Sequence, residues 1–287
     1  MKTVGKVVLC VVAYLLGITI TGIVAGAFKL PSPAPPPGST VQGLFYASIV
    51  GTLLLATGLT PLAMRLGGSR WTRFGALWLM IYVAVSVNTV IEAKFFSDII
   101  TVSIGVMCLH QLLPCVLLAG ALALLFTPTD APILFPTLSP AQWAWRVLVA
   151  WAAFPIIYIA FGMCVGTFVV PEYLKGTAGL KLPTMATILR TQYLIRSPLF
   201  LISSLPIVAL WTGSRKQLLI AFGIAEAMMV GVHGLAEAYW LPTLLRVLHS
   251  LEITCDSFAY VAVLTFLFTA KQKKTVQVPA AAPAVLA

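Results

Sequence analysis

Eight apolar stretches constrain this chain more than any other feature of its sequence. A membrane-crossing helix needs about 20 mostly apolar residues. Of the 287 residues, 60% are hydrophobic and 9% are charged, whereas an average soluble domain carries roughly 25% charged residues. The composition excludes a soluble enzyme, a nucleic-acid binder and a disulfide scaffold. We predict an all-α integral membrane protein with transmembrane helices over residues 7–28, 43–64, 73–94, 99–126, 143–169, 192–211, 217–240 and 246–269.

The charges predict how the chain is oriented. Lys and Arg outnumber Asp and Glu by 18 to 8, and Lys and Arg concentrate in cytoplasmic loops of membrane proteins. An even number of spans places both termini on one side, and that side receives eleven of the 18 Lys and Arg residues. We therefore expect an integral protein of a bacterial inner (plasma) membrane with both termini in the cytoplasm. The surrounding partner is the lipid bilayer, and no nucleic acid is expected to bind.

The second half of the sequence echoes the first, which indicates an internal duplication. Shifted by 145 residues, Pro61 matches Pro206 and Glu92 matches Glu237. The turn Gly68-Ser69-Arg70 likewise matches Gly213-Ser214-Arg215. We predict two parallel four-helix repeats, because a repeat with an even number of spans inserts twice in the same orientation. The repeats cover residues 1–135 and 136–272, followed by a disordered cytoplasmic tail over 273–287.

Two small-residue spacings match between the halves at an offset of 140 residues. They are Gly22-xxx-Gly26 in the first span and Gly162-xxx-Gly166 in the fifth. Such spacings let helix backbones approach closely. We expect these glycines to pack the first and fifth helices.

The predicted spans contain ionisable side chains, which are costly in a bilayer and typically functional. All three histidines and five of the eight acidic residues fall inside spans. At 100° per residue, Glu226, His233 and Glu237 would lie within about 40° of one another on the seventh helix. The candidate polar pathway comprises Glu92, His110, Glu226, His233, Glu237, His249, Glu252 and Asp256.

The eighth span carries a second polar stripe. His249, Glu252 and Asp256 follow one another at spacings of three and four residues, so they share one helical face. Arg196 and Arg246 begin the sixth and eighth spans and are candidate counter-ions. With cytoplasmic termini, most of these groups lie in the outer half of the membrane, which predicts a funnel open to the outside.

Two functions follow directly from this chemistry. Chains of Asp, Glu and His along a bundle interior are typical of proton- or cation-coupled transporters, and a repeat interface is a common place for the transport site. We favour a small transporter or permease that moves a small solute, proton or cation. A metal site is the alternative: His233, Glu237, His249 and Glu252 offer the nitrogen and oxygen ligands that suit zinc, iron or manganese.

Two further possibilities stay open at this stage. With or without a divalent metal, a His/Glu pair could act as general acid and base in an enzyme for an outer-leaflet or lipid-linked substrate. The polar pairs could instead join helices in a non-catalytic subunit of a membrane complex. The sequence names neither a substrate nor an oligomeric state, and it contains no P-loop, Rossmann fingerprint or nucleophile elbow.

Overall fold

The computed structural model describes residues 2–32, 34–98, 102–126 and 138–269. Within these ranges the chain is helical and contains no β-strand. Among the described residues, eight helices are long and apolar enough to cross a membrane, the same number as the segments predicted from the sequence. The boundary between the two predicted repeats and the predicted tail over 273–287 both lie outside the described residues.

Five of the eight spans are continuous α-helices. They are α1 (Thr3–Ala27), α2 (Val41–Ala63), α5 (Ile104–Leu125), α6 (Pro140–Leu174) and α11 (Thr243–Phe268). A short 3₁₀ turn, Thr177–Gly179, follows α6.

The other three spans each contain a π-helical segment, which places one extra residue in the helical turn. The third span consists of α3 (Arg70–Ile81), η1 (Tyr82–Asn88) and α4 (Thr89–Phe96). The sixth consists of α7 (Met185–Thr191), η3 (Gln192–Arg196) and α8 (Ser197–Ala209). The seventh consists of α9 (Arg215–Ala227), η4 (Met228–Val232) and α10 (His233–Glu237). Single π turns occur frequently at functional sites.

Most helix starts are fixed by side-chain caps, in which a hydroxyl accepts a hydrogen bond from a backbone N–H two or three residues ahead. The capping residues are Thr40, Ser69, Ser103, Ser139, Thr184 and Ser214. The cap at Thr184 explains why the sixth span begins at Met185 rather than at the predicted residue 192. The fifth span also extends further than predicted, to Leu174 instead of residue 169.

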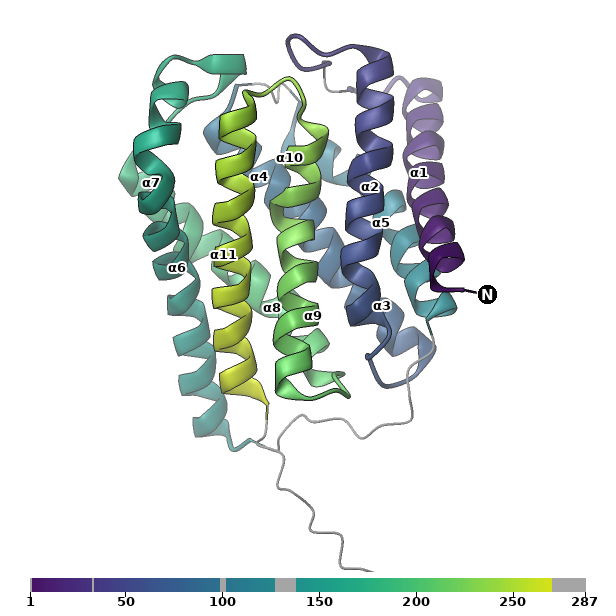
Figure 1. The fold of residues 1–287 in the computed structure, drawn as a ribbon, viewed down its shortest axis with the longest axis vertical. Helices are drawn as coiled ribbons and strands as arrows, with labels where there is room; N and C mark the ends of the chain where they lie inside the picture. Colours follow the sequence, from purple (N-terminus) through teal and green to yellow (C-terminus); the bar gives the residue numbers. More distant parts are fainter. Residues whose placement is uncertain (1, 33, 99–101, 127–137, 270–287) are drawn as a thin grey trace, which may run out of the picture.

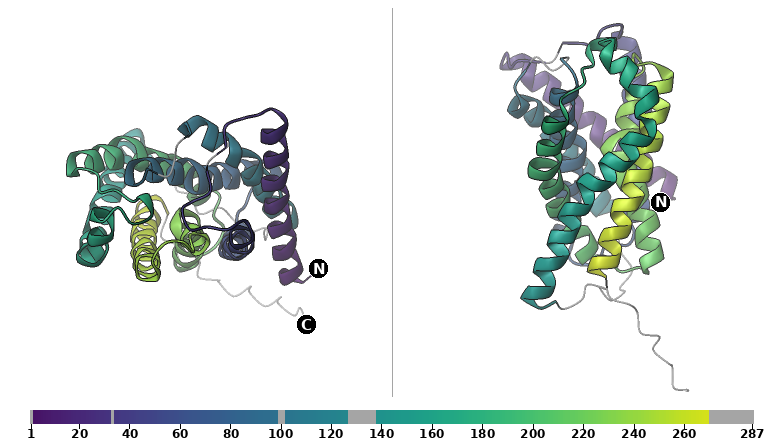
Figure 2. Two further views of the ribbon diagram at one scale, coloured as in Figure 1. Left: turned by 90° about the horizontal axis from the view of Figure 1, so that it is seen from above. Right: turned by 90° about the vertical axis from the view of Figure 1, so that its left-hand side faces the viewer.

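The helices form a bundle two layers deep. Figure 1 shows α2, α9 and α11 side by side, with α3, α5 and α8 behind them. Helix α9 packs on both α2 and α11, and α3 packs on both α5 and α8. Helix α1 lies along α5 and α6 along α11, so that α1 and α6 stand at opposite ends of the bundle when it is seen from above (Figure 2).

The two ends of the bundle have different constructions. We call the end formed by residues 28–32, 34–40, 97–98, 175–184 and 238–242 the proline-loop end. There an antiparallel bridge joins Ser97 to Leu180, and the Lys181 ammonium lies 2.6 Å from the Asp98 carboxylate. We call the opposite end, formed by the turns 64–69 and 210–214, the Trp211 end.

The two turns of the Trp211 end bind each other through their backbones. Leu66 and Trp211 form an antiparallel bridge, and both are fully buried. Gly67 N–H donates to Leu210 C=O at 2.7 Å, and Thr212 N–H donates to Arg65 C=O at 3.1 Å. These two bonds fix the end of the second span against the end of the sixth.

Of the four matched glycines of α1 and α6, one lies close to another helix among the described residues: a Cβ atom at Gly162 of α6 would lie 3.2 Å from Oε1 of Glu252 in α11. A Cβ atom at Gly22, Gly26 or Gly166 would meet no heavy atom within 4 Å. Gly17 is the glycine at which α1 approaches another helix, because a Cβ there would lie 2.5 Å from the backbone of Pro114 in α5. In α1 the spacing therefore identified the wrong glycines, since it does not say which face of the helix meets a neighbour.

The buried interior is apolar, and so is much of the outer surface. Leu59, Leu77 and Phe222, from α2, α3 and α9, are completely buried in the core. Large apolar side chains are exposed around the outside of the bundle, among them Val8, Leu16, Leu148, Met163, Leu251 and Phe266.

Candidate functional site

Arg196 is a buried cation between the third and sixth spans, with only 2% of its side chain exposed. Its Nη1 atom lies 2.9 Å from Oε1 of Glu92, and its Nε–H donates to Oδ1 of Asn88 at 2.6 Å. The guanidinium also lies 5.0 Å from the ring centre of Tyr158 and 5.6 Å from that of Phe154. A carboxylate, an amide oxygen and aromatic faces together compensate the charge that burial removes from water. The predicted counter-ion role of Arg196 is thereby realised, with Glu92 as its partner.

Glu237 has a different environment. It is the last residue of α10, is half-buried, and rests directly on the backbone of α2. A Cβ atom at Gly51 would lie 2.4 Å from both Cγ and Oε1 of Glu237, so only glycine leaves room for this side chain. Among the described residues, no Lys, Arg or His nitrogen lies within 4.0 Å of its carboxylate.

The Glu237 contact belongs to a row of glycines through which α2 meets the seventh span and the turn after it. Cβ atoms placed at these glycines would collide with Tyr239 at Gly43, with Glu237 at Gly51 and with Met228 at Gly58. The Tyr239 hydroxyl additionally accepts a hydrogen bond from Thr40 N–H at 2.6 Å. The backbone of α2 therefore lies close to its neighbours from Gly43, near the start of the helix, to Gly58, near its end.

A hydrogen-bonded series of three side chains lies between α6 and α11 at the proline-loop end. The Tyr173 hydroxyl lies 3.0 Å from Nε2 of His249, and Nδ1 of His249 lies 2.7 Å from Oε2 of Glu252. Oε1 of Glu252 faces Gly162 of α6, where a Cβ atom would lie 3.2 Å away. Histidine is thus held through both ring nitrogens, between a phenol and a carboxylate.

Deeper in the bundle, three further polar groups follow on from this series. Oδ1 of Asp256, the hydroxyl of Tyr260 and Oε2 of Glu226 are each buried without a hydrogen-bond partner among the described residues. Asp256 is close enough to Glu252 for their charges to interact, and Tyr260 is close enough to Glu226. Oε1 of Glu226 accepts a hydrogen bond from Ser204 of α8 at 3.1 Å. Buried polar atoms without a protein partner are places where ordered water is expected.

The remaining two histidines bind carbonyl groups of their own spans. Nδ1 of His233 lies 2.6 Å from the Met228 carbonyl, five residues earlier, where the π segment η4 begins. Nδ1 of His110 lies 2.8 Å from the Val106 carbonyl, and its Nε2 is buried without a partner among the described residues.

The predicted polar stripe on the seventh span is divided between two faces. Glu226 points to Ser204 of α8, whereas Glu237 packs on Gly51 of α2. The π segment between them adds a residue to the turn, so the assumed 100° per residue does not hold across it. The stripe of α11, which contains no π segment, follows the predicted spacing.

The structure does not gather the four tentative metal ligands His233, Glu237, His249 and Glu252. His249 and Glu252 form one pair, but no group of three or more His, Cys, Asp or Glu side chains in the described part of the chain is arranged to hold a metal ion.

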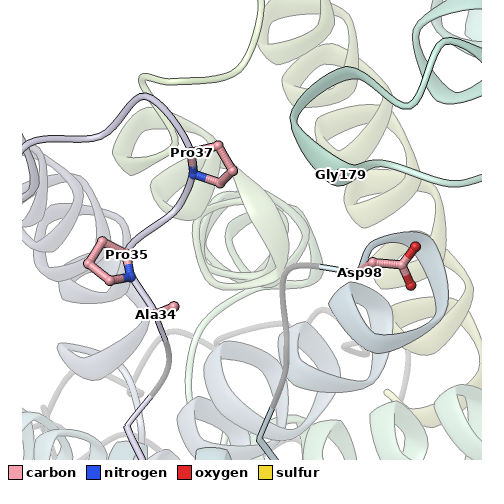
Figure 3. A pocket seen from close by; sticks show the side chains of 5 residues that line it. All are labelled: Ala34, Pro35, Pro37, Asp98 and Gly179. Atoms are coloured by element: carbon pink, nitrogen blue, oxygen red, sulfur yellow. The ribbon is translucent and has the colours of Figure 1, made fainter.

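A pocket of about 220 Å³ opens at the proline-loop end. Figure 3 shows Pro35 and Pro37 on one side of it and Asp98 and Gly179 on the other. None of the predicted site residues lines this pocket. Of these residues, Glu226, His233 and Glu252 are buried, and the other five are partly exposed.

Sequence reasoning missed three contributors to the site. Tyr173 lay beyond the predicted end of the fifth span, so its partnership with His249 was not foreseen. Ser204 is one of many hydroxyls in apolar helices and carries no distinguishing pattern. Gly51 did have a signal, because the 145-residue offset pairs it with Arg196.

No protein-family model matches the chain, and no curated protein and no solved structure matches it significantly either.

Proposed function

We propose that the protein is a small proton- or cation-coupled membrane transporter built from two parallel four-helix repeats. The observation that carries this proposal is the line of buried and half-buried polar groups along α11. It runs from the Tyr173–His249–Glu252 series through Asp256 to Tyr260. Such a line is costly in an apolar bundle, and intramembrane series of Asp, Glu and His typically serve proton movement.

The duplication is supported by the bonds of the Trp211 end. Leu66 and Trp211, which face each other in the bridge, are matched by the same 145-residue offset that aligns the two halves. The same shift carries Gly67 to Thr212 and Arg65 to Leu210, so each of the two backbone hydrogen bonds is transformed into the other. A two-fold axis passing through the bridge accounts for this exchange, as it does in isologous interfaces.

The helices repeat their irregularities as well. The offset of 145 residues carries η1 (Tyr82–Asn88) onto a range that contains η4 (Met228–Val232). It also carries the Ser69 cap onto the Ser214 cap. In the second and sixth spans the capping threonines, Thr40 and Thr184, differ by 144 residues instead. The π segment η3, present in the sixth span and lacking in α2, accounts for the additional residue.

The charges at the Trp211 end favour the cytoplasmic side for it. Arg73 donates to the carbonyls of Ala123 and Phe126 at the end of α5, and Arg146 and Arg215 donate to carbonyls at the end of α11. Cations stabilise helix C-termini, and their concentration at one end follows the positive-inside rule. The apolar residues exposed around the bundle would face lipid, which supports an inner-membrane location.

In the proposed mechanism, protons enter at the proline-loop end. His249 exchanges a proton with the Tyr173 hydroxyl through Nε2 or with the Glu252 carboxylate through Nδ1, because these are the groups that its two ring nitrogens contact. Water bound at the unpartnered atoms of Asp256, Tyr260 and Glu226 extends the route toward the middle of the bundle. Movement of the solute is coupled to the protonation of these carboxylates.

Charge movement in response to a pH step tests this proposal without knowledge of the solute. Proteoliposomes on a solid-supported membrane are exposed to a rapid acidification, and the resulting current is recorded. The proposal predicts a transient current that is absent from protein-free liposomes and is reduced in Asp256→Asn. Equal currents in protein-free and wild-type liposomes would reject it.

The Tyr173–His249–Glu252 series also favours a second candidate, an enzyme that acts on an outer-leaflet lipid. A histidine bonded to a hydroxyl on one side and a carboxylate on the other has the arrangement of a general base with its orienting group. This candidate predicts a change in bilayer lipids on incubation with the wild-type protein, detected by mass spectrometry, that is lost in His249→Gln.

A further inference from the structure

We propose that Glu237 is the proton-binding carboxylate of the contact between the two four-helix units, whereas its counterpart Glu92 is a fixed structural anion. This inference rests on the proposed function and deepens it, because it assigns the two sides of the interface different roles. Both contacts join one unit to the other: Glu92 of α4 binds Arg196 of η3, and Glu237 of α10 packs on Gly51 of α2.

The two contacts occupy matching places. Glu92 and Glu237 differ by 145 residues. Each lies four residues beyond a polar residue at the end of a π segment: Asn88 is the last residue of η1, and His233 directly follows η4. Their partners, Arg196 and Gly51, differ by the same 145 residues. A shift of 145 residues therefore relates the members of the Glu92–Arg196 contact to those of the Glu237–Gly51 contact. We treat the two contacts as two forms of the same arrangement.

They differ in the presence of a cation. Arg196 lies 2.9 Å from the Glu92 carboxylate, and it is held further by Asn88. At the matching position, Gly51 provides no side chain. The Glu237 carboxyl group is instead in contact with the α2 backbone, with no cationic nitrogen of the described residues inside 4.0 Å.

The other groups around Glu237 do not replace that cation. Helix α2 contains no Asp, Glu, Lys, Arg or His. From α1, Tyr14 is close enough for an electrostatic interaction with Glu237, but its hydroxyl donates to Gln111 of α5 at 3.3 Å. On the seventh span itself, His233 is bonded to the Met228 carbonyl.

On α11, which also packs against α10, the acidic, basic and imidazole side chains are Arg246, His249, Glu252 and Asp256. His249 and Glu252 bind each other, Asp256 interacts with the charges of Glu252, Arg196 and Glu92, and Arg246 makes no ion pair among the described residues. None of the four thus supplies a bonded counter-charge to Glu237.

An ionised carboxylate held between helices without a counter-ion is strongly disfavoured, and such a group takes up a proton instead. The close Glu237–Gly51 contact therefore favours the neutral acid. Loss of the proton favours separation of α10 from α2, because separation exposes more of the half-buried carboxylate to water. The Glu92–Arg196 pair keeps its charges in both states and holds the opposite side of the interface together.

Labelling with dicyclohexylcarbodiimide distinguishes the two glutamates within one molecule, because this apolar reagent adds to protonated carboxyl groups in membranes. The wild-type protein in lipid nanodiscs is labelled at neutral pH, digested and analysed by mass spectrometry. We expect Glu237 to be labelled at least roughly tenfold more than Glu92. Such a ratio corresponds to a tenfold larger protonated fraction of Glu237 at the same pH. Labelling of Glu237 falls as the pH is raised, and Arg196→Gln brings labelling to Glu92.

Equal labelling of the two glutamates, or labelling of Glu237 that is independent of pH, would overturn the inference. The outcome is separable from that of the transport proposal. Selective labelling of Glu237 in a protein that produces no current after a pH step would support the proton site and reject transport. Proton-driven currents accompanied by equal labelling would support transport and reject the assignment to Glu237.

Discussion

Leu66 and Trp211 face each other in an antiparallel bridge although 145 residues separate them. The bridge joins the turn after the second span to the turn after the sixth, and a hydrogen bond on each side of it repeats the other under the same residue offset. This relationship supports the proposed duplication. It is also the basis for comparing Glu92 with Glu237, because it fixes which positions of the two halves correspond.

The Arg196–Glu92 pair is expected to contribute to stability. Arg196→Met leaves Glu92 and Asn88 without their cation and removes the contacts with the aromatic rings. Breaking a buried ion pair by removing one partner costs roughly 3–5 kcal/mol, and the 28% exposure of Glu92 puts the expected loss at the low end. Thermal unfolding in detergent, followed by tryptophan fluorescence, measures it.

A double-mutant cycle provides the control for that prediction. Arg196→Met combined with Glu92→Gln should lose less stability than the sum of the two single variants, because the double variant buries no unpaired charge. If the losses of stability in the two single variants simply added in the double variant, Arg196 and Glu92 would not form the ion pair seen in the structure.

Gly51→Ala is expected to destabilise the contact between α2 and α10. The new Cβ atom would lie 2.4 Å from Cγ and Oε1 of Glu237, and overpacking of this kind typically costs about 1–3 kcal/mol. Gly22→Ala in α1 is the matched control, since no heavy atom lies within 4 Å of a Cβ there. The two variants are compared by their unfolding temperatures.

Removal of the Glu237 side chain should relieve the effect of Gly51→Ala. If Gly51→Ala combined with Glu237→Ala is as unstable as Gly51→Ala alone, the Glu237 side chain is not the group that clashes with the new Cβ atom on α2.

The orientation of the bundle can be tested with membrane-impermeant thiol reagents on intact cells. Ser32→Cys introduces an exposed thiol at the proline-loop end and Lys216→Cys one at the Trp211 end. We expect labelling of the first variant in whole cells and of the second only after permeabilisation. The wild-type protein, with its five native cysteines, gives the background, and the reverse pattern would place the termini outside.

Tyr173 should affect proton entry if it is the outermost member of the polar series. Tyr173→Phe removes the hydroxyl that lies 3.0 Å from His249 Nε2, and we expect slower currents after a pH step with little loss of stability. Tyr46→Phe is the control, because Tyr46 is exposed on α2. Identical kinetics in the two variants would exclude the Tyr173 hydroxyl from the route.

Much of this fold could be predicted from hydrophobic runs alone, because apolar length determines which segments can cross a bilayer. The capping hydroxyls of Thr184 and Ser103 set the starts of the sixth and fourth spans, and hydropathy does not register such local hydrogen bonds. The fifth span was predicted too short: α6 continues past residue 169 to Leu174.

The candidate site was predictable where its helix is regular. The stripe on α11 kept the spacing read from the sequence, and His249 and Glu252 are paired as neighbours on one face. The stripe on the seventh span did not, because η4 separates Glu226 from Glu237 and no local sequence signal announces a π turn. The contrast between Arg196 and Gly51 could be seen in the aligned halves, but only the contacts with Glu92 and Glu237 give it a physical meaning.

The most direct test of the proposed transport function is the current that follows a pH step on proteoliposomes, with wild type compared to Asp256→Asn and Glu252→Gln. Both acids lie in the polar line along α11, Glu252 buried and Asp256 half-buried, and each amide keeps the shape of the side chain while removing its titration. We predict a wild-type current above that of protein-free liposomes and its strong reduction in both variants. A wild-type current indistinguishable from protein-free liposomes, or full currents in both variants, would contradict the proposed proton route.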